Sequence, residues 1–253
     1  MGSRKYRFCS GTHLSSWRKW AKAVGDLVWD FRHTLLVVLL VLAFCAVTQT
    51  AMWLDLVSLD QLAASRSNPS GVVTAIFTHW DWSLLLENAE SLLFFTGLFV
   101  ISNYPRDRAE RVRRGRWFAA LVFPIAVVVN LVDVLRSPSS SQGASGLVFA
   151  GLGIAFALFL TNTMDEASDL IRPAHADRAG PQGRWERFRT VCWFAVNGSL
   201  FLSFLILALS NQAVLFGTGD VTINASAHAL GFVLGVIATL VWHFSWARSK
   251  VPG

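Results

Sequence analysis

The sequence predicts an all-α protein that crosses a membrane several times. Of its 253 residues, 53% are hydrophobic and only 15% are charged, a balance that does not suit a soluble domain of this size. Apolar stretches that suit membrane-spanning helices of about 20 residues recur along the chain. They cover residues 34–53, 83–103, 117–132, 137–164, 190–219 and 221–247. We therefore expect six membrane-spanning helices.

Two of these stretches depart from a simple apolar run. The second carries Glu87, Asn88 and Glu90 near its start, and polar side chains inside a span often mark a functional position. We expect at least one of the two glutamates to be solvated at the membrane interface. The third stretch is short, but it extends past Asp133.

The basic residues predict the orientation of the chain. If the N-terminus is cytoplasmic, nearly all lysines and arginines fall on that side, and only Arg66 and Arg136 fall outside. Short loops that are rich in basic residues stay in the cytoplasm, so we expect both termini there. The basic excess would be confined to juxtamembrane loops, where it orients the chain and contacts anionic lipid. No aromatic or glycine-rich nucleic-acid-binding module accompanies it, so nucleic acid is not an expected partner.

The chain divides into three parts. Residues 1–33 form a basic N-terminal segment with Trp17, Trp20 and Trp29 but no signal-peptide cleavage site, and we expect a cytoplasmic, interfacial helix there. Residues 34–247 form the membrane domain, and residues 248–253 form a cytoplasmic tail. Segments 58–70, 137–142 and 172–183 have the composition of loops. Short loops without an appended domain favour a multi-pass protein of a prokaryotic cell membrane.

Two polar residues within the most apolar stretches are the candidates for chemistry. Ser145 stands in the sequence Gly-Ala-Ser-Gly (143–146), and His228 stands in Ala-His-Ala-Leu-Gly (227–231). A polar side chain in lipid is costly, so the pair suggests a nucleophile and its general base. The alternative is that the serine serves only helix packing and that the histidine binds a neighbouring carbonyl group.

The expected topology places both residues at a similar depth near the external side. Ser145 shares a helix face with Phe149, because the two are four residues apart. His228, Gly231 and Gly235 also share a face, and glycines allow two helix backbones to approach closely. We expect the serine Oγ to reach the imidazole, while N–H groups at the helix start face the developing oxyanion.

These motifs resemble those of the rhomboid intramembrane serine proteases. That family has a six-helix core with its N-terminus inside, a Gly-x-Ser-Gly motif at the start of the fourth helix, and an Ala-His-x-x-Gly-x-x-x-Gly motif in the sixth. The chain matches both motifs, at residues 143–146 and 227–235. The second helix of the family usually carries His-x4-His-x3-Asn, and here His79, Leu84 and Asn88 stand in that register. The similarity covers residues 34–247, which implies a rhomboid-like bundle.

The resemblance implies a role for each matched residue. Ser145 would be the nucleophile, His228 the general base and Asn88 an oxyanion donor, with no metal or cofactor and no third triad member. The remaining site residues are Phe149, which would stack on the histidine; Gly143, which would line the site; Gly146, Gly231 and Gly235, which would pack the helices; and His79, which would bridge loop backbone in a structural role.

The chain departs from the family at two points. Leu84 replaces the second histidine and, four residues before Asn88, we expect it to face the site. One oxyanion donor is therefore missing, and such a loss typically costs about 10²- to 10³-fold in rate. The first external loop also lacks the Trp-Arg pair common in the family, which concerns the anchoring of that loop.

The hypothesis that follows is a serine endopeptidase that hydrolyses peptide bonds in or near transmembrane segments of membrane proteins. Two alternatives remain open: a rhomboid-like protein that binds transmembrane clients without cutting them, and a small transporter or lipid-interacting scaffold in which Glu87, Glu90 and His228 form a polar path. The sequence does not predict the client protein or the oligomeric state.

Overall fold

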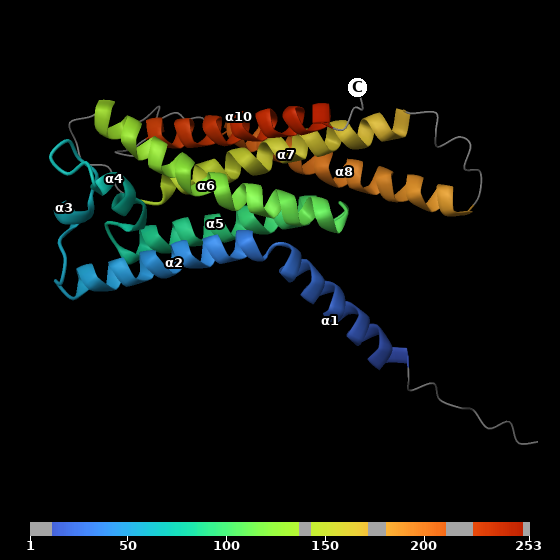
Figure 1. The fold of residues 1–253 in the computed structure, drawn as a ribbon, viewed down its shortest axis with the longest axis horizontal. Coiled ribbons are helices and arrows are strands. Elements are labelled where there is room, and N and C mark those ends of the chain that lie inside the picture. The colour runs from blue at the N-terminus through green and yellow to red at the C-terminus, as the bar shows by residue number, and fades with distance from the viewer. Residues whose placement is uncertain (1–11, 137–142, 172–180, 211–224, 250–253) are drawn as a thin grey trace, which may run out of the picture.

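The computed structural model describes residues 12–136, 143–171, 181–210 and 225–249, and its regular elements there are helices (Figure 1). Six of these helices are long and apolar enough to cross a membrane, which confirms the predicted all-α, multi-pass architecture. They are α2 (Arg32–Trp53), α5 (Trp82–Asn103), α6 (Arg108–Arg136), α7 (Ser145–Ile171), α8 (Pro181–Ser210) and α10 (Ala225–Ser249). The shorter elements are α3 (Leu59–Leu62), α4 (Gly71–Thr74) and the 3-10 helix η1 (Ala75–Phe77).

Helix α7 is the central helix of the bundle. Of the most apolar part of α7, 67% is buried inside the protein, whereas the corresponding figure for α8 is 11%. Helix α7 packs against α5, α6, α8 and α10. Its buried residues include many small ones, such as Gly146, Ala150 and Gly153, which allow neighbouring helices to come close. Large apolar side chains, among them Phe99 and Phe118, fill the core around it.

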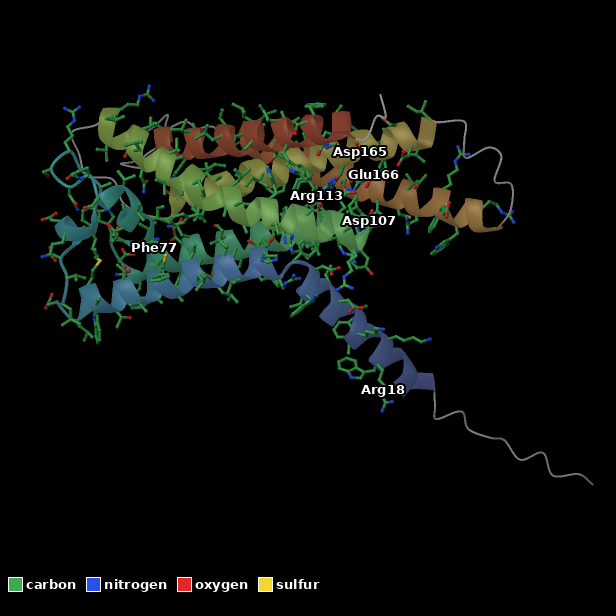
Figure 2. All side chains as sticks on the ribbon, in the orientation of Figure 1. Arg18, Phe77, Asp107, Arg113, Asp165 and Glu166 are labelled. Carbon is green, nitrogen blue, oxygen red and sulfur yellow. The ribbon has the colours of Figure 1, made fainter. Side chains whose placement is uncertain are left out.

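The bundle has two distinct ends (Figure 1). At one end, α7 and α10 begin, and η1 and the short helices α3 and α4 lie at this same end; we call it the site end. At the other end, α6 begins and α7 terminates; we call this the charged end. Figure 2 shows Asp107, Arg113, Asp165 and Glu166 gathered at the charged end, while Phe77 lies at the site end.

The structure corrects two expectations about loops. Residues 58–70 contain helix α3 rather than loop alone. Helix α6 begins at Arg108, so Arg111–Arg116 lie within a helix, and Arg114 is fully buried. The expectation that basic residues are confined to juxtamembrane loops is therefore wrong for Arg114. Its charge is compensated inside the protein, by contacts described below. Residues 137–142, expected as a loop and as the start of the fourth span, lie outside the described residues.

A further helix, α1 (Thr12–Asp30), extends obliquely away from the charged end of the bundle (Figure 1). A helix was expected in this N-terminal segment. Only Phe31 separates α1 from α2, and the Phe31 side chain is buried in the core, where its ring meets Phe99 edge-on at 5.7 Å. The junction between the two helices is therefore fixed to the bundle.

Candidate active site

The backbone just before α7 is held in place from two sides. Gly143 has φ of +101°, a left-handed conformation that glycine adopts without steric cost. Its N–H donates to the Ala75 carbonyl oxygen at 2.8 Å. The N–H of Ala144 donates to His79 Nε2 at 3.3 Å. These two bonds tie the start of α7 to η1 and to the segment before α5, which fixes the position of the next residue, Ser145.

Ser145 is the first residue of α7, and it is half-buried. The first N–H groups of a helix have no acceptor within the helix. The first bond of this helix runs from the Val148 N–H to the Ala144 carbonyl oxygen at 2.9 Å. The positive end of the helix dipole thus lies beside the serine hydroxyl, a suitable place for negative charge to develop.

Helices α7 and α10 touch through their backbones. A Cβ added at Gly231 would lie 2.6 Å from the Gly146 carbonyl oxygen, and one added at Gly235 would overlap the Ala150 carbonyl oxygen. Conversely, a Cβ at Gly153 would overlap the Phe232 carbonyl oxygen. Gly146 itself faces α6, since a Cβ there would lie 2.9 Å from a Val129 methyl group. The glycines predicted to pack helices therefore lie at close helix contacts.

His228 lies in the first turn of α10, and 8% of its surface is exposed. The Phe149 ring stacks on its imidazole, with ring centroids 4.1 Å apart and an interplanar angle of 13°. This is the stacking that the family resemblance implied. Ser145 lies one turn before Phe149 on the same face of α7, so the serine and the histidine are both at this end of the bundle.

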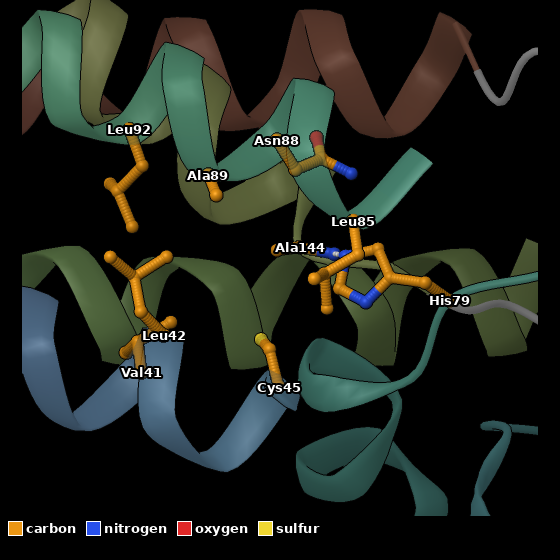
Figure 3. Close-up of a pocket in the computed structure, with 9 residues that line it drawn as sticks. All are labelled: Val41, Leu42, Cys45, His79, Leu85, Asn88, Ala89, Leu92 and Ala144. Carbon is orange, nitrogen blue, oxygen red and sulfur yellow. Dashed lines mark hydrogen bonds between the residues drawn. The ribbon is translucent and has the colours of Figure 1, made fainter. Parts of the chain in front are cut away.

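Asn88 and the start of α7 border a common cavity of about 120 Å³ (Figure 3). Its lining comes from α2, α5 and the segments before α5 and α7: Val41, Leu42, Cys45, His79, Leu85, Asn88, Ala89, Leu92 and Ala144. Within the described part of the chain, the buried Asn88 Nδ2 has no hydrogen-bond partner. A buried amide without a partner is unfavourable unless a ligand or water completes it. Asn88 Nδ2 is thus an unsatisfied donor at a cavity that is also lined by Ala144, the residue before Ser145.

His79 is fully buried between η1 and α5. Burial lowers its pKa from 6.5 to about 4, although the Phe77 backbone and the Asp81 carboxylate raise it. The imidazole is therefore neutral near pH 7, which leaves Nε2 free to accept the hydrogen bond from Ala144. This contact is the loop-bridging one that we expected of His79.

The remaining predicted residues, Leu84, Glu87 and Glu90, lie in the first turns of α5. Asp81 precedes the helix, and its Oδ1 accepts a hydrogen bond from the Leu84 N–H at 2.8 Å. Leu84 is half-buried, but Leu85 rather than Leu84 lines the cavity beside Asn88. Glu87 and Glu90 are both exposed on the protein surface.

Sequence reasoning missed a buried polar network at the charged end. Arg114 donates to Glu110 Oε1 at 2.9 Å, to Asn103 Oδ1 at 2.8 Å and to Asn162 Oδ1 at 2.9 Å. Asn162 Nδ2 in turn donates to Ser102 Oγ at 2.7 Å. Pairs such as Glu110 and Arg114, four residues apart on a helix, were the available signal.

The same network continues to α8. Ser102 Oγ donates to Asn197 Oδ1 at 3.1 Å, and Asn197 Nδ2 donates to Glu166 Oε1 at 3.0 Å. Side chains from α5, α6, α7 and α8 thus form one connected set. The hydrogen bonds that run from Arg114 through Asn162, Ser102 and Asn197 to Glu166 are the arrangement expected of a structural network.

Among the described residues, no group of three or more histidine, cysteine and acidic side chains could hold a metal ion.

The fold is that of a multi-pass helical membrane protein. A serine, a histidine and an asparagine amide without a hydrogen-bond partner lie at one end of its bundle. Comparison with protein-family models, curated proteins and solved structures finds no match to this chain.

Proposed function

We propose that the protein is an intramembrane serine endopeptidase of rhomboid type, with a Ser145–His228 dyad. The observation that carries the proposal is the stacking of His228 on Phe149, one helical turn from Ser145. The stacked Phe149 ring fixes the plane of the imidazole near the start of α7. A fixed imidazole suits a general base, which must keep one orientation while it takes and returns a proton.

The reaction would be acyl transfer. His228 takes the Ser145 proton as Oγ attacks a peptide carbonyl carbon, and it then protonates the leaving amine. The backbone N–H of Ser145 and the Asn88 amide hold the oxyanion. Water hydrolyses the resulting acyl-enzyme, and the cavity beside Asn88 is large enough for water molecules.

The substrates would be single-span membrane proteins that unwind near the membrane surface, since a helical segment hides its carbonyl groups from attack. We infer that the site end is external and that both termini are cytoplasmic, as the distribution of basic residues favours. A cell membrane of a prokaryote suits this arrangement.

Leu84 favours a second candidate function, in which the protein binds transmembrane clients without cutting them. The family histidine that Leu84 replaces would supply an oxyanion donor, and its absence weakens catalysis by about 10²- to 10³-fold if no other group compensates. The retained serine, histidine and Asn88 favour the protease instead.

Cleavage of a single-span reporter by the purified protein in liposomes tests the proposal. Ser145→Ala and His228→Ala should each reduce cleavage to background, and a fluorophosphonate probe should label the wild type but not Ser145→Ala. Ser203→Ala is the matched control, because Ser203 is exposed on α8, and it should cleave like the wild type. Leu84→His should raise the cleavage rate.

Equal cleavage by the wild type and Ser145→Ala would overturn the proposed nucleophile. If the folded wild type neither cleaves a reporter that an active relative cuts nor reacts with the probe, the client-binding function becomes the better explanation. Co-purification of the reporter with the wild type would then support it directly.

A further inference from the structure

Helix α1 carries an apolar face that the bundle does not cover. Trp17, Trp20, Val24 and Val28 recur at a spacing of three or four residues and therefore share one face. Their exposed fractions are 62%, 58%, 38% and 52%, respectively. The two tryptophan rings stack with centroids 5.2 Å apart. So large an exposed face on an isolated helix indicates a binding surface.

The other face of α1 is cationic. Arg18, Lys19 and Lys22 are exposed there, with Asp26 as the exposed acidic residue, and Figure 2 shows Arg18 extending from the helix. At the end of α1, the Arg32 guanidinium lies 4.7 Å from the centroid of the Trp29 ring. Trp17 and Trp20 lie opposite the basic residues, which is the pattern of a helix in the interface of an anionic membrane.

The attachment of α1 places it near a membrane surface. Asp30, its last residue, is fully buried, and its carboxylate accepts hydrogen bonds from Arg108 Nε at 3.0 Å and Arg111 Nη2 at 2.7 Å. Two residues later α2 begins, and α2 is one of the six apolar helices. The contacts of Arg108 and Arg111 with Asp30 hold α1 at the end of a membrane-spanning helix. The surface next to α1 is therefore the lipid headgroups.

We propose that α1 docks on an anionic phospholipid surface. The face of Trp17, Trp20, Val24 and Val28 enters the interface, and Arg18, Lys19 and Lys22 meet the lipid phosphates. The pair of arginines that binds Asp30 sets the angle at which α1 leaves the bundle. This inference is independent of the proposed protease activity and of which side of the membrane α1 occupies.

Spin labels on the full-length protein test the docking. A cysteine is placed on the apolar face (Val24→Cys) or the cationic face (Lys22→Cys), with Cys9, Cys45 and Cys192 replaced by alanine. Each labelled protein is reconstituted into phosphatidylcholine vesicles with or without phosphatidylglycerol, and accessibility to oxygen and to an aqueous nickel complex is measured. With phosphatidylglycerol, the label at residue 24 should lie about 5–10 Å below the headgroup boundary, whereas the label at residue 22 should stay open to nickel.

A charge variant sharpens the test. Replacing Arg18, Lys19 and Lys22 by glutamine should move the label at residue 24 outward in phosphatidylglycerol vesicles. The matched control replaces Arg184, Arg187 and Arg189, exposed basic residues near the start of α8, and should leave the label immersed.

Three results would overturn the proposal. Equal nickel access at residues 22 and 24 in all vesicles would show that α1 stays in water. Immersion that is independent of phosphatidylglycerol would refute the choice of an anionic surface. Dipolar coupling between residue-24 labels of different copies, with nickel excluded in both lipids, would show that a second copy covers the face.

Discussion

At the site end, α7 and α10 meet through glycine backbones, whereas at the charged end four helices meet through long polar side chains. A Cβ at Gly231 would stand 2.6 Å from a carbonyl oxygen of α7, so contact there depends on the absence of side chains. At the charged end, contact depends on the presence of Arg114, Asn162 and Asn197 and on their hydrogen bonds. The two ends therefore respond to substitution in opposite ways.

The difference has a functional meaning under the proposed activity. The site end carries a free Asn88 amide and a cavity, features that cost stability but leave room for a substrate. At the charged end, hydrogen bonds join Arg114, Asn162 and Asn197 into one network across the helices that carry the site. Stability and chemistry are thus concentrated at separate ends, and substitutions can test that separation.

Removing the central cation of the charged end should have the largest effect. Arg114→Met keeps the length of the side chain but leaves the Glu110 carboxylate and Asn103 Oδ1 without the hydrogen bonds that Arg114 donates, whereas Asn162 Oδ1 keeps its hydrogen bond from Arg106 at 2.7 Å. Breaking a buried charge pair in this way costs about 3–5 kcal/mol. The free energy of unfolding, measured by denaturant titration in mild detergent micelles, should fall by that amount, while cleavage per folded molecule should stay unchanged.

Arg116→Met is the matched control for this variant. Arg116 lies on the same helix and is exposed, with its Nε 3.3 Å from His33 Nε2. Exposed pairs contribute about 1 kcal/mol or less, so this variant should be nearly as stable as the wild type. Equal stability of the two variants would contradict a structural role for the Arg114 network.

The sequence predicts features that arise from residues close together in the chain, but not contacts between residues far apart in it. The six apolar helices and the Gly-Ala-Ser-Gly and Ala-His motifs are local patterns, and they could be recognised without a fold. The link between Ser102 and Asn197 joins residues 95 positions apart, and no local pattern indicates it. Arg114 was assigned to a cytoplasmic loop because it stands in a cluster of basic residues, and its hydrogen-bond partners come from three helices.

Adding a side chain at the close contact between α7 and α10 should have the next largest effect. In Gly235→Val, the new Cβ would overlap the Ala150 carbonyl oxygen, which is backbone and cannot move aside. The helices must separate, at a cost near the upper end of the roughly 1–3 kcal/mol typical of overpacking. Because the stacking of Phe149 on His228 depends on the same contact, cleavage per folded molecule should also fall.

Gly97→Val provides the comparison on α5, because Gly97 is exposed and a Cβ there meets no atom within 4 Å. This variant should keep both its stability and its cleavage rate, apart from the small effect of helix propensity. If Gly235→Val retained full cleavage, close backbone contact would not be what holds the histidine in place.

Acid should weaken the site end by a smaller amount, through His79. Its pKa is about 4 in the folded protein and 6.5 in the unfolded chain, so the unfolded chain binds more protons between these values. Stability is therefore fully present above pH 6.5 and falls as the pH drops towards 4, by about 2 kcal/mol at pH 5. Protonation also removes the Nε2 acceptor that holds Ala144 beside Ser145. His79→Gln should abolish this part of the pH dependence in unfolding titrations at pH 7 and pH 5, and an unchanged pH dependence would show that other groups cause it.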